Sequence, residues 1–269
     1  MTLTITKEIA CKVLETVDAG LVKGLGKPVP GAMCVEAAVC FAMGLPHSDE
    51  PACVSRALRS LKIRLNDSAW SSSASRAKGM RRLALAQLGS AGAIDDKAFS
   101  QKVATLVIQL SVPVALRAAA SVQKDAYKKA AMLDAASLCE REPTRENSLI
   151  AKNAARAAYA ADSAADSAAR AAYAAAYAAD SAARAAYAAA YAAAYAADSA
   201  YAAARDKHLS DFAEGVVQIL VEMKAPGCEW LSLTELPNVT QRLGGTADAD
   251  IQDRERSNIA NGQDTDERD

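Results

Sequence analysis

The sequence predicts an all-α protein with a helical N-terminal domain, a long alanine- and tyrosine-rich helix and a returning C-terminal helix. Apolar residues recur at spacings of three and four, and alternating β-branched runs are almost missing. Of the 269 residues, 51% are hydrophobic, which suffices for a sizeable core. We divide the chain into a globular domain (1–142), a repeat helix (143–206), a C-terminal helix (207–233) and a disordered acidic tail (234–269).

The N-terminal domain opens with two segments that have clear boundary signals. Residues 6–26 offer Thr6 as an N-cap and Gly24 or Gly26 as a stop. The nearly all-apolar run 31–46 is short enough to be a central core helix. Further helices are predicted at residues 52–65, 72–89 and 95–142, where Pro113 lacks a backbone N–H and should kink or split the last segment.

The surroundings of this chain are predicted from its composition. No signal peptide opens the sequence, and the repeat is interrupted every few positions by Arg, Asp or Ser, so we find no apolar run of the roughly 18 to 20 residues that span a bilayer. The net charge of −1 gives no global signal for nucleic acid or for an anionic membrane. We expect a cytoplasmic protein without a membrane partner, whose six scattered cysteines are reduced and buried.

The repeat region is too long to fit inside the globular domain as one straight helix. Residues 144–214 contain neither glycine nor proline and are dominated by alanine, the best helix former. One helix of that length would measure roughly 100 Å, whereas a globule of about 150 residues is only some 40 Å across. The helix must therefore project, fold back or lie along another copy.

A 14-residue period runs through the repeat, as in ARAAYAAAYAADSA (169–182) followed at once by ARAAYAAAYAAAYA. Fourteen residues are two heptads, and most of the other side chains fall at two positions three residues apart, which is an a/d-like coiled-coil pattern. An insertion of 14 residues leaves every later side chain on the same face of a supercoiled helix. A spacer or binding arm tolerates such a change, and an active-site scaffold does not.

We interpret the tyrosine stripe of this helix as a contact surface. Each half-buried ring contributes roughly 2 kcal/mol, compared with at most about 0.8 kcal/mol for an alanine methyl group. The surface would face the N-terminal domain, a second copy or a partner protein; the alternative is a solvated helix whose Tyr and Arg serve solubility. The predicted contact residues are Tyr159, Tyr173, Tyr177, Tyr187, Tyr191, Tyr195, Tyr201, Arg170 and Arg184.

Candidates for chemistry are confined to the loop 44–53. There His47 and Cys53 could form a nucleophile pair, but the sequence offers no orienting third group. A zinc site needs four converging ligands, usually announced by paired cysteines at short spacing, which the sequence lacks, and it has no Gly-rich phosphate loop. We therefore predict no catalytic residue, no metal site and no cofactor.

The strongest local charge lies in residues 51–90, where eight basic residues face one acid, Asp67. If the two helices form a helix-turn-helix pair, these side chains could bind phosphates, although the connection NDSAWSSSAS exceeds the usual turn length. The alternatives are a solvated basic face or one that docks the acidic tail. The residues of this alternative nucleic-acid-binding module are Arg56, Arg59, Lys62, Arg64, Arg76, Lys78, Arg81 and Arg82.

The blocks MCVEAAVCFAMGLPH, LKIRLNDSAW and RRLALAQLGS, followed by the Ala/Tyr/Asp/Arg repeat and APGCEWL, resemble a group of uncharacterised bacterial and bacteriophage proteins built in the same order. The likeness covers roughly residues 1–233. It implies a cytoplasmic protein of phage or prophage derivation and implies no catalytic residues.

These observations together predict a non-enzymatic structural or interaction protein. Its partner would be a second copy of the chain or another protein, bound through the striped helix. Nucleic acid, bound through the basic helices, is the alternative partner. An enzyme acting through His47 and Cys53 is the third hypothesis.

Overall fold

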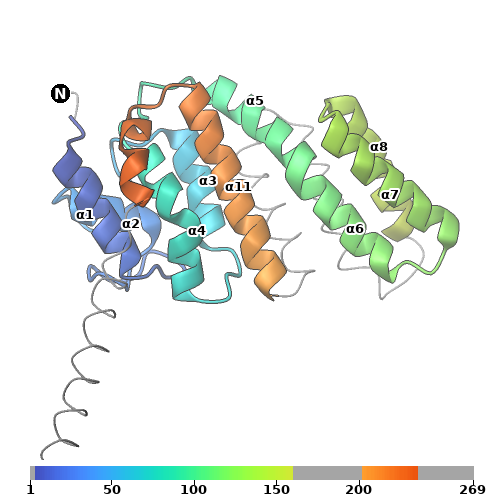
Figure 1. Cartoon of the computed structure of the whole chain (residues 1–269), viewed down its shortest axis with the longest axis horizontal. Helices are drawn as coiled ribbons and strands as arrows, with labels where there is room; N and C mark the ends of the chain where they lie inside the picture. Colours follow the sequence, from blue (N-terminus) through green and yellow to red (C-terminus); the bar gives the residue numbers. More distant parts are fainter. Residues whose placement is uncertain (1–3, 160–201, 236–269) are drawn as a thin grey trace, which may run out of the picture.

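The computed structural model describes residues 4–159 and 202–235, and it confirms the all-α prediction (Figure 1). Within those two ranges no strand occurs beyond an isolated bridge between Gly26 and Met33. In chain order the elements are α1 (Lys7–Asp18), α2 (Val35–Ala42), α3 (Arg56–Asn66), α4 (Ser73–Ala86), α5 (Asp96–Leu106), the π-helical segment η1 (Val107–Ser111), α6 (Val112–Val122), α7 (Ala126–Arg141), α8 (Arg145–Tyr159), α11 (Ala202–Glu222) and the 3-10 segment η2 (Pro226–Glu235).

The first helix begins where the sequence predicts and ends earlier. The Thr6 hydroxyl accepts a hydrogen bond from the backbone N–H of Ile9, as an N-cap should. The helix ends at Asp18, because Gly20 adopts a φ of +112° that breaks the helical path. The predicted stops at Gly24 and Gly26 therefore lie in the loop that leads to α2.

The central feature of the fold is a continuous helical rod made of α5, η1 and α6 (Figure 1). Pro113, the second residue of α6, does not split the rod. Immediately before it the backbone widens into one π-helical turn, in which the N–H of Val112 bonds to the carbonyl of Val107, five residues back. A proline lacks the N–H that an α-helix needs, and the π turn is where the helix accommodates that loss.

The rod is also a longer apolar stretch than the sequence analysis predicted for any part of the chain. By length and composition the stretch Asp96–Val122 could cross a membrane, and 61% of its most apolar window is buried within the fold. Core helices of soluble proteins satisfy the same criterion when they are largely buried. The prediction that no apolar run is long enough to cross a bilayer is therefore wrong as far as length and composition go.

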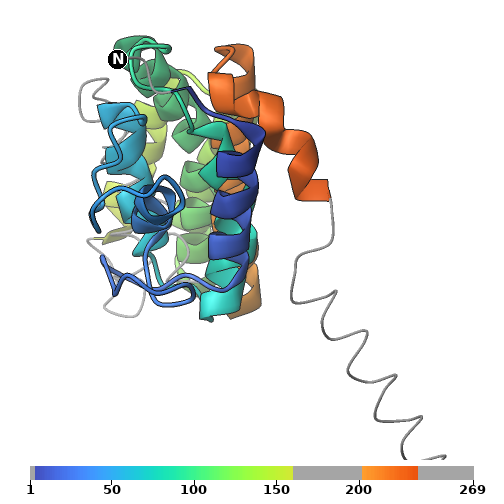
Figure 2. The same ribbon diagram turned by 90° about the vertical axis from the view of Figure 1, so that its left-hand side faces the viewer.

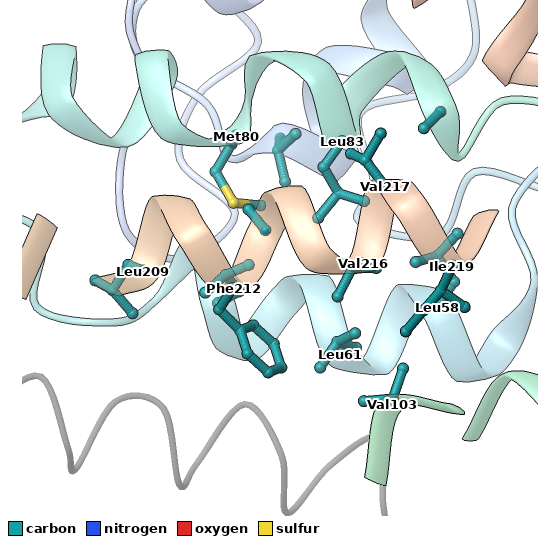
Figure 3. Close-up of a cluster of buried hydrophobic side chains, with 14 of the residues drawn as sticks. Leu58, Leu61, Met80, Leu83, Val103, Leu209, Phe212, Val216, Val217 and Ile219 are labelled. Carbon is teal, nitrogen blue, oxygen red and sulfur yellow. The ribbon is translucent and has the colours of Figure 1, made fainter. Parts of the chain in front are cut away.

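The last α-helix, α11, packs against α4, α5, η1 and η2 and contributes to the hydrophobic core. Figure 3 shows its apolar face between α3 and α4, with Phe212 and Val216 near Leu61 of α3. Each of these three side chains is fully buried. On the other side α1, α4 and η2 pack against one another, with α1 nearest the viewer in Figure 2.

Two glycines let α11 approach its neighbours closely. A Cβ at Gly79 of α4 would lie 2.3 Å from the Trp70 ring and 2.7 Å from Ser210 Oγ of α11. A Cβ at Gly215 of α11 would lie 2.6 Å from a methyl group of Leu106 on α5. The close packing of α11 against α4 and α5 thus depends on glycine, which has no side chain, at positions 79 and 215.

At the far end of the rod, α6, α7 and α8 pack against one another. Ala151 and Ala155 of α8 are fully buried, and the Cys139 thiol of α7 lies 3.5 Å from the carbonyl oxygen of Asn147. The helix α8 is therefore part of the packed body formed by residues 4–159 and 202–235, which we call the frame. From the sequence, in contrast, residues 143–206 were assigned to the repeat. Likewise α11 begins at Ala202, ahead of the predicted start at 207.

Candidate functional site

The structure places the two junctions of the repeat in the packed frame. Of the nine predicted contact residues, Tyr159 is the last residue of α8. The chain rejoins the described fold at Ala202, the first residue of α11. The remaining predicted contact residues lie outside the described residues: Tyr173, Tyr177, Tyr187, Tyr191, Tyr195, Tyr201, Arg170 and Arg184.

The N-terminal junction is α8, a helix with small residues on its buried face and larger apolar residues on its exposed face. Its buried stripe consists of small residues, among them Ser148, Ala151 and Ala155, so it lies close to its neighbours. Leu149 and Ile150, in contrast, are 37% and 45% exposed. The helix therefore carries apolar side chains on its outer face just before the repeat begins.

The C-terminal junction is held by a side-chain contact between distant parts of the chain. Asp206, in the first turns of α11, accepts a hydrogen bond at 2.9 Å from the backbone N–H of Ser71 and another from the Ser71 hydroxyl. Ser71 lies just before the N-terminus of α4, where a carboxylate is favourable. Burial pushes the pKa of Asp206 upward, but hydrogen bonds from Ser71 and Ser75 outweigh it and lower the pKa.

The next turn of α11 enters the core. His208 is 8% exposed, and its Nε2 makes no hydrogen bond to any described residue. Burial lowers the pKa of His208 to about 4, against a smaller opposing effect of Asp211. The imidazole is therefore neutral at physiological pH. It is buried, as are Leu209 and Phe212 on the same helix.

Two of the eight predicted phosphate-binding residues are buried inside the fold. Lys62 is fully buried, and its Nζ lies 3.1 Å from Oε1 of Glu36, which is also fully buried. Arg76 is nine-tenths buried and donates to the carbonyl oxygens of Asn66 and Leu21 at 2.7 and 2.9 Å. These two basic side chains tie α2, α3, α4 and the loop after α1 together.

Three further basic residues are paired within the molecule. Arg81 makes a bidentate ion pair with Asp18, with nitrogen–oxygen distances of 2.7 and 3.0 Å. The same guanidinium donates a hydrogen bond to the carbonyl oxygen of Thr234. Arg82 pairs with Glu214 at 2.9 Å, and Arg59 pairs with Glu50 at 2.9 Å. The remaining members of the set, Arg56, Arg64 and Lys78, are exposed.

The two residues of the proposed nucleophile pair have separate partners. The Nε2–H of His47 donates to the carbonyl oxygen of Gly26 at 3.2 Å, and the Cys53 thiol lies 3.5 Å from the Met43 sulfur. Burial raises the pKa of the Cys53 thiol, which disfavours the nucleophilic thiolate. All six cysteines are free thiols, and Cys34, Cys40, Cys53 and Cys139 are buried.

Comparison with known proteins found no relative of this chain. No family model matches the chain, and no curated protein or solved structure matches it. Among the residues that the structure describes, no group of three or more His, Cys, Asp or Glu side chains could hold a metal ion.

Sequence reasoning missed the residues that hold the repeat in place. The contact of Asp206 with Ser71 joins positions 135 residues apart, so no local sequence pattern indicates that pairing. A signal was present in the serine run before α4, since exposed hydroxyl and N–H groups at a helix start attract a carboxylate. The sequence alone did not indicate which carboxylate that would be.

Proposed function

We propose that this protein is a self-assembling structural protein in which the helical frame presents the repeat 160–201 as a surface for a second copy. The observation that carries the proposal is the position of the repeat between two packed helices. At the described ends of α8 and α11 the packing rests on Ala151, Ala155, Leu209 and Phe212, all fully buried. The packing at the two described junctions thus rests on side chains that lie outside residues 160–201.

The composition of the repeat favours a second copy as the partner. Arg and Asp alternate with Tyr at the same two heptad positions, so the stripe contains both charges and is complementary to itself. Each half-buried tyrosine contributes roughly 2 kcal/mol, and several rings in register supply the free energy that a stable dimer needs. Another protein with a similar striped helix is the second class of partner.

The test replaces Tyr173, Tyr177, Tyr187 and Tyr191 by Ala in the full chain. We expect the helical content measured by circular dichroism to be preserved, because alanine is the better helix former. The dissociation constant measured by analytical ultracentrifugation should rise by at least 100-fold, since several rings leave the contact.

The matched control is Tyr127→Ala in α7, where the tyrosine is 85% exposed and lies outside the repeat. This variant should associate as the unaltered chain does. Equal association of the fourfold variant and the control would remove the basis of the proposal.

The observations favour this function over nucleic-acid binding. At least five of the eight basic residues in the segment 56–82 have partners inside the fold, which leaves fewer charges for phosphates than the linear sequence indicates. Electrostatic binding to DNA or RNA scales with the number of phosphates neutralised. The basic helices therefore serve mainly to hold the frame together.

A further inference from the structure

The side of α8 that faces away from its packed neighbours carries a row of exposed residues. The helix buries Asn147, Ser148, Ala151 and Ala155. On the opposite side lie Glu146, Leu149, Ile150, Asn153 and Arg156, all of them exposed, which we call the outer row. At 100° per residue the outer row spans about 120° of the helix circumference, and its two ends are about 15 Å apart along the helix axis. The outer row is thus one continuous strip of surface.

The centre of the outer row is apolar, and its two ends carry opposite charges. Leu149 and Ile150, which are neighbours in the sequence, are 37% and 45% exposed. Glu146 lies in the first turn of α8 and Arg156 in the last. Neither makes an ion pair with another residue that the structure describes. A partner that covers the apolar centre and pairs with both charges would therefore bind favourably.

A reversed copy of the same helix is complementary to the outer row. In an antiparallel pair related by a two-fold axis level with Ala151, positions equally distant from Ala151 in the two directions face each other. Glu146 and Arg156 are each five residues from Ala151, so the acid of each copy lies opposite the base of the other. Leu149 and Ile150 of both copies then lie beside the axis. A parallel pair would instead place like charges together.

We propose that the outer row of α8 is a surface on which α8 of a second copy binds antiparallel, across a two-fold axis. This contact uses no residue of the repeat 160–201, so it goes beyond the proposed function and adds a second point of attachment between copies. One helix face is smaller than the interface of a typical stable dimer. We therefore expect the outer row to strengthen association rather than to supply all of it.

The first test exchanges the charges of the outer row in the full chain. Glu146→Arg places Arg opposite Arg in the antiparallel pair, and Arg156→Glu places Glu opposite Glu. Each variant alone should raise the dissociation constant, measured by analytical ultracentrifugation, by about tenfold, because two attractive pairs become repulsive. An equimolar mixture of the two variants should regain the affinity of the unaltered chain, since every Arg then meets a Glu. Absence of this rescue would overturn the antiparallel contact.

The second test places a charge in the apolar centre. Ile150→Lys should raise the dissociation constant by about tenfold or more, because an ammonium group would enter an apolar contact. The control is Val221→Lys on α11, where the valine is 43% exposed and lies outside the outer row, and this variant should associate as the unaltered chain does. Circular dichroism checks that all variants remain helical. If Glu146 and Arg156 serve only the dipole of α8, the charge exchanges will lower the free energy of unfolding without changing association, and the proposal is wrong.

The outcome for the outer row can be told apart from the outcome for the repeat. If the fourfold tyrosine variant loses association while Ile150→Lys and the charge exchanges keep it, the outer row is not a contact and the proposed function stands. If the fourfold variant keeps association and Ile150→Lys loses it, the outer row is the contact and the repeat is not. A chain that stays monomeric at every concentration would contradict both.

Discussion

Buried ionisable side chains determine how this molecule responds to pH. Lys62, Glu36 and His208 are all buried, the first two as an ion pair between α3 and α2 and the third on α11. Burial disfavours the charged form of each, so it raises the pKa of Glu36 and lowers the pKa of Lys62 and of His208. The opposite charge of the partner counteracts this effect within the Glu36–Lys62 pair, whereas His208 makes no hydrogen bond through Nε2 to the described residues.

We expect His208 to weaken the fold in mild acid. Its pKa falls from an ordinary value of 6.5 to about 4 in the folded chain. Between these two values the unfolded chain binds a proton that the folded chain does not, so the free energy of unfolding decreases as the pH falls through this window. The full effect is on the order of 3 kcal/mol. Urea unfolding at pH 7, 6, 5 and 4 measures it.

The variant His208→Gln isolates this contribution, because glutamine does not titrate. It should be less stable than the unaltered chain near pH 7 or equal to it, and it should lose less free energy between pH 6.5 and 4. Parallel pH profiles for the two chains would mean that His208 does not control the acid response.

Single residues were predicted well where the cause is local. The N-cap at Thr6 follows from backbone chemistry within a few residues. The burial of Lys62 and Arg76 could not be predicted, since a linear count of charges does not reveal which side of a helix faces the core. Their partners, Glu36 and Leu21, are brought to them only by the packing of separate helices.

At the scale of elements, the crossing of α4 and α11 depends on Gly79. In an exposed helix the change from glycine to alanine is stabilising by up to about 1 kcal/mol. Here we expect the opposite sign for Gly79→Ala, a loss of about 1 to 3 kcal/mol, because the new methyl group would lie 2.3 Å from the Trp70 ring. Urea unfolding followed by tryptophan fluorescence measures the change.

The matched control is Gly215→Ala, whose methyl group would meet only the flexible tip of Leu106. Its cost should be smaller, since the leucine side chain can rotate away. If Gly79→Ala were the more stable chain, the close crossing at Trp70 would be refuted.

A second prediction at this scale concerns the repeat. It tests the heptad phase of the tyrosine stripe rather than its composition. Deletion of residues 170–183 removes 14 residues, and deletion of 170–178 removes nine; both remove Tyr173 and Tyr177. Fourteen residues are two heptads and preserve the face of the stripe, whereas nine residues rotate the remainder by about 180°. We expect the 14-residue deletion to associate and the nine-residue deletion to fail, as measured by sedimentation. Equal behaviour of the two would contradict a phased stripe.

Helix positions were largely predictable from periodicity and caps, and the exceptions have physical causes. Pro113 was predicted to kink or split the long segment; it does not split it, because a π turn accommodates the missing N–H and the helix continues to Val122. The packed part of α8 was assigned to the repeat because its alanines resemble those that follow. Only tertiary contacts distinguish the buried Ala151 and Ala155 from repeat alanines.

For the whole molecule, the fold combines a frame that is joined through one central rod with a repeat inserted between two of its helices. One contiguous hydrophobic cluster extends through the described helices from α1 to α11. The described helices on either side of the repeat, α8 and α11, thus belong to a single packed body. Sequence reasoning could predict the helical class, the repeat and a C-terminal helix that returns to the core, but not which helices that C-terminal helix would contact.

The measurement that tests the central claim most directly is the absolute mass of the full chain, determined by size-exclusion chromatography with light scattering at low and high salt. The account predicts a particle of at least twice the 28.0 kDa chain mass that persists in high salt, because tyrosine burial rather than charge supplies most of the contact. A monomer of 28.0 kDa at all concentrations and both salt levels would contradict it.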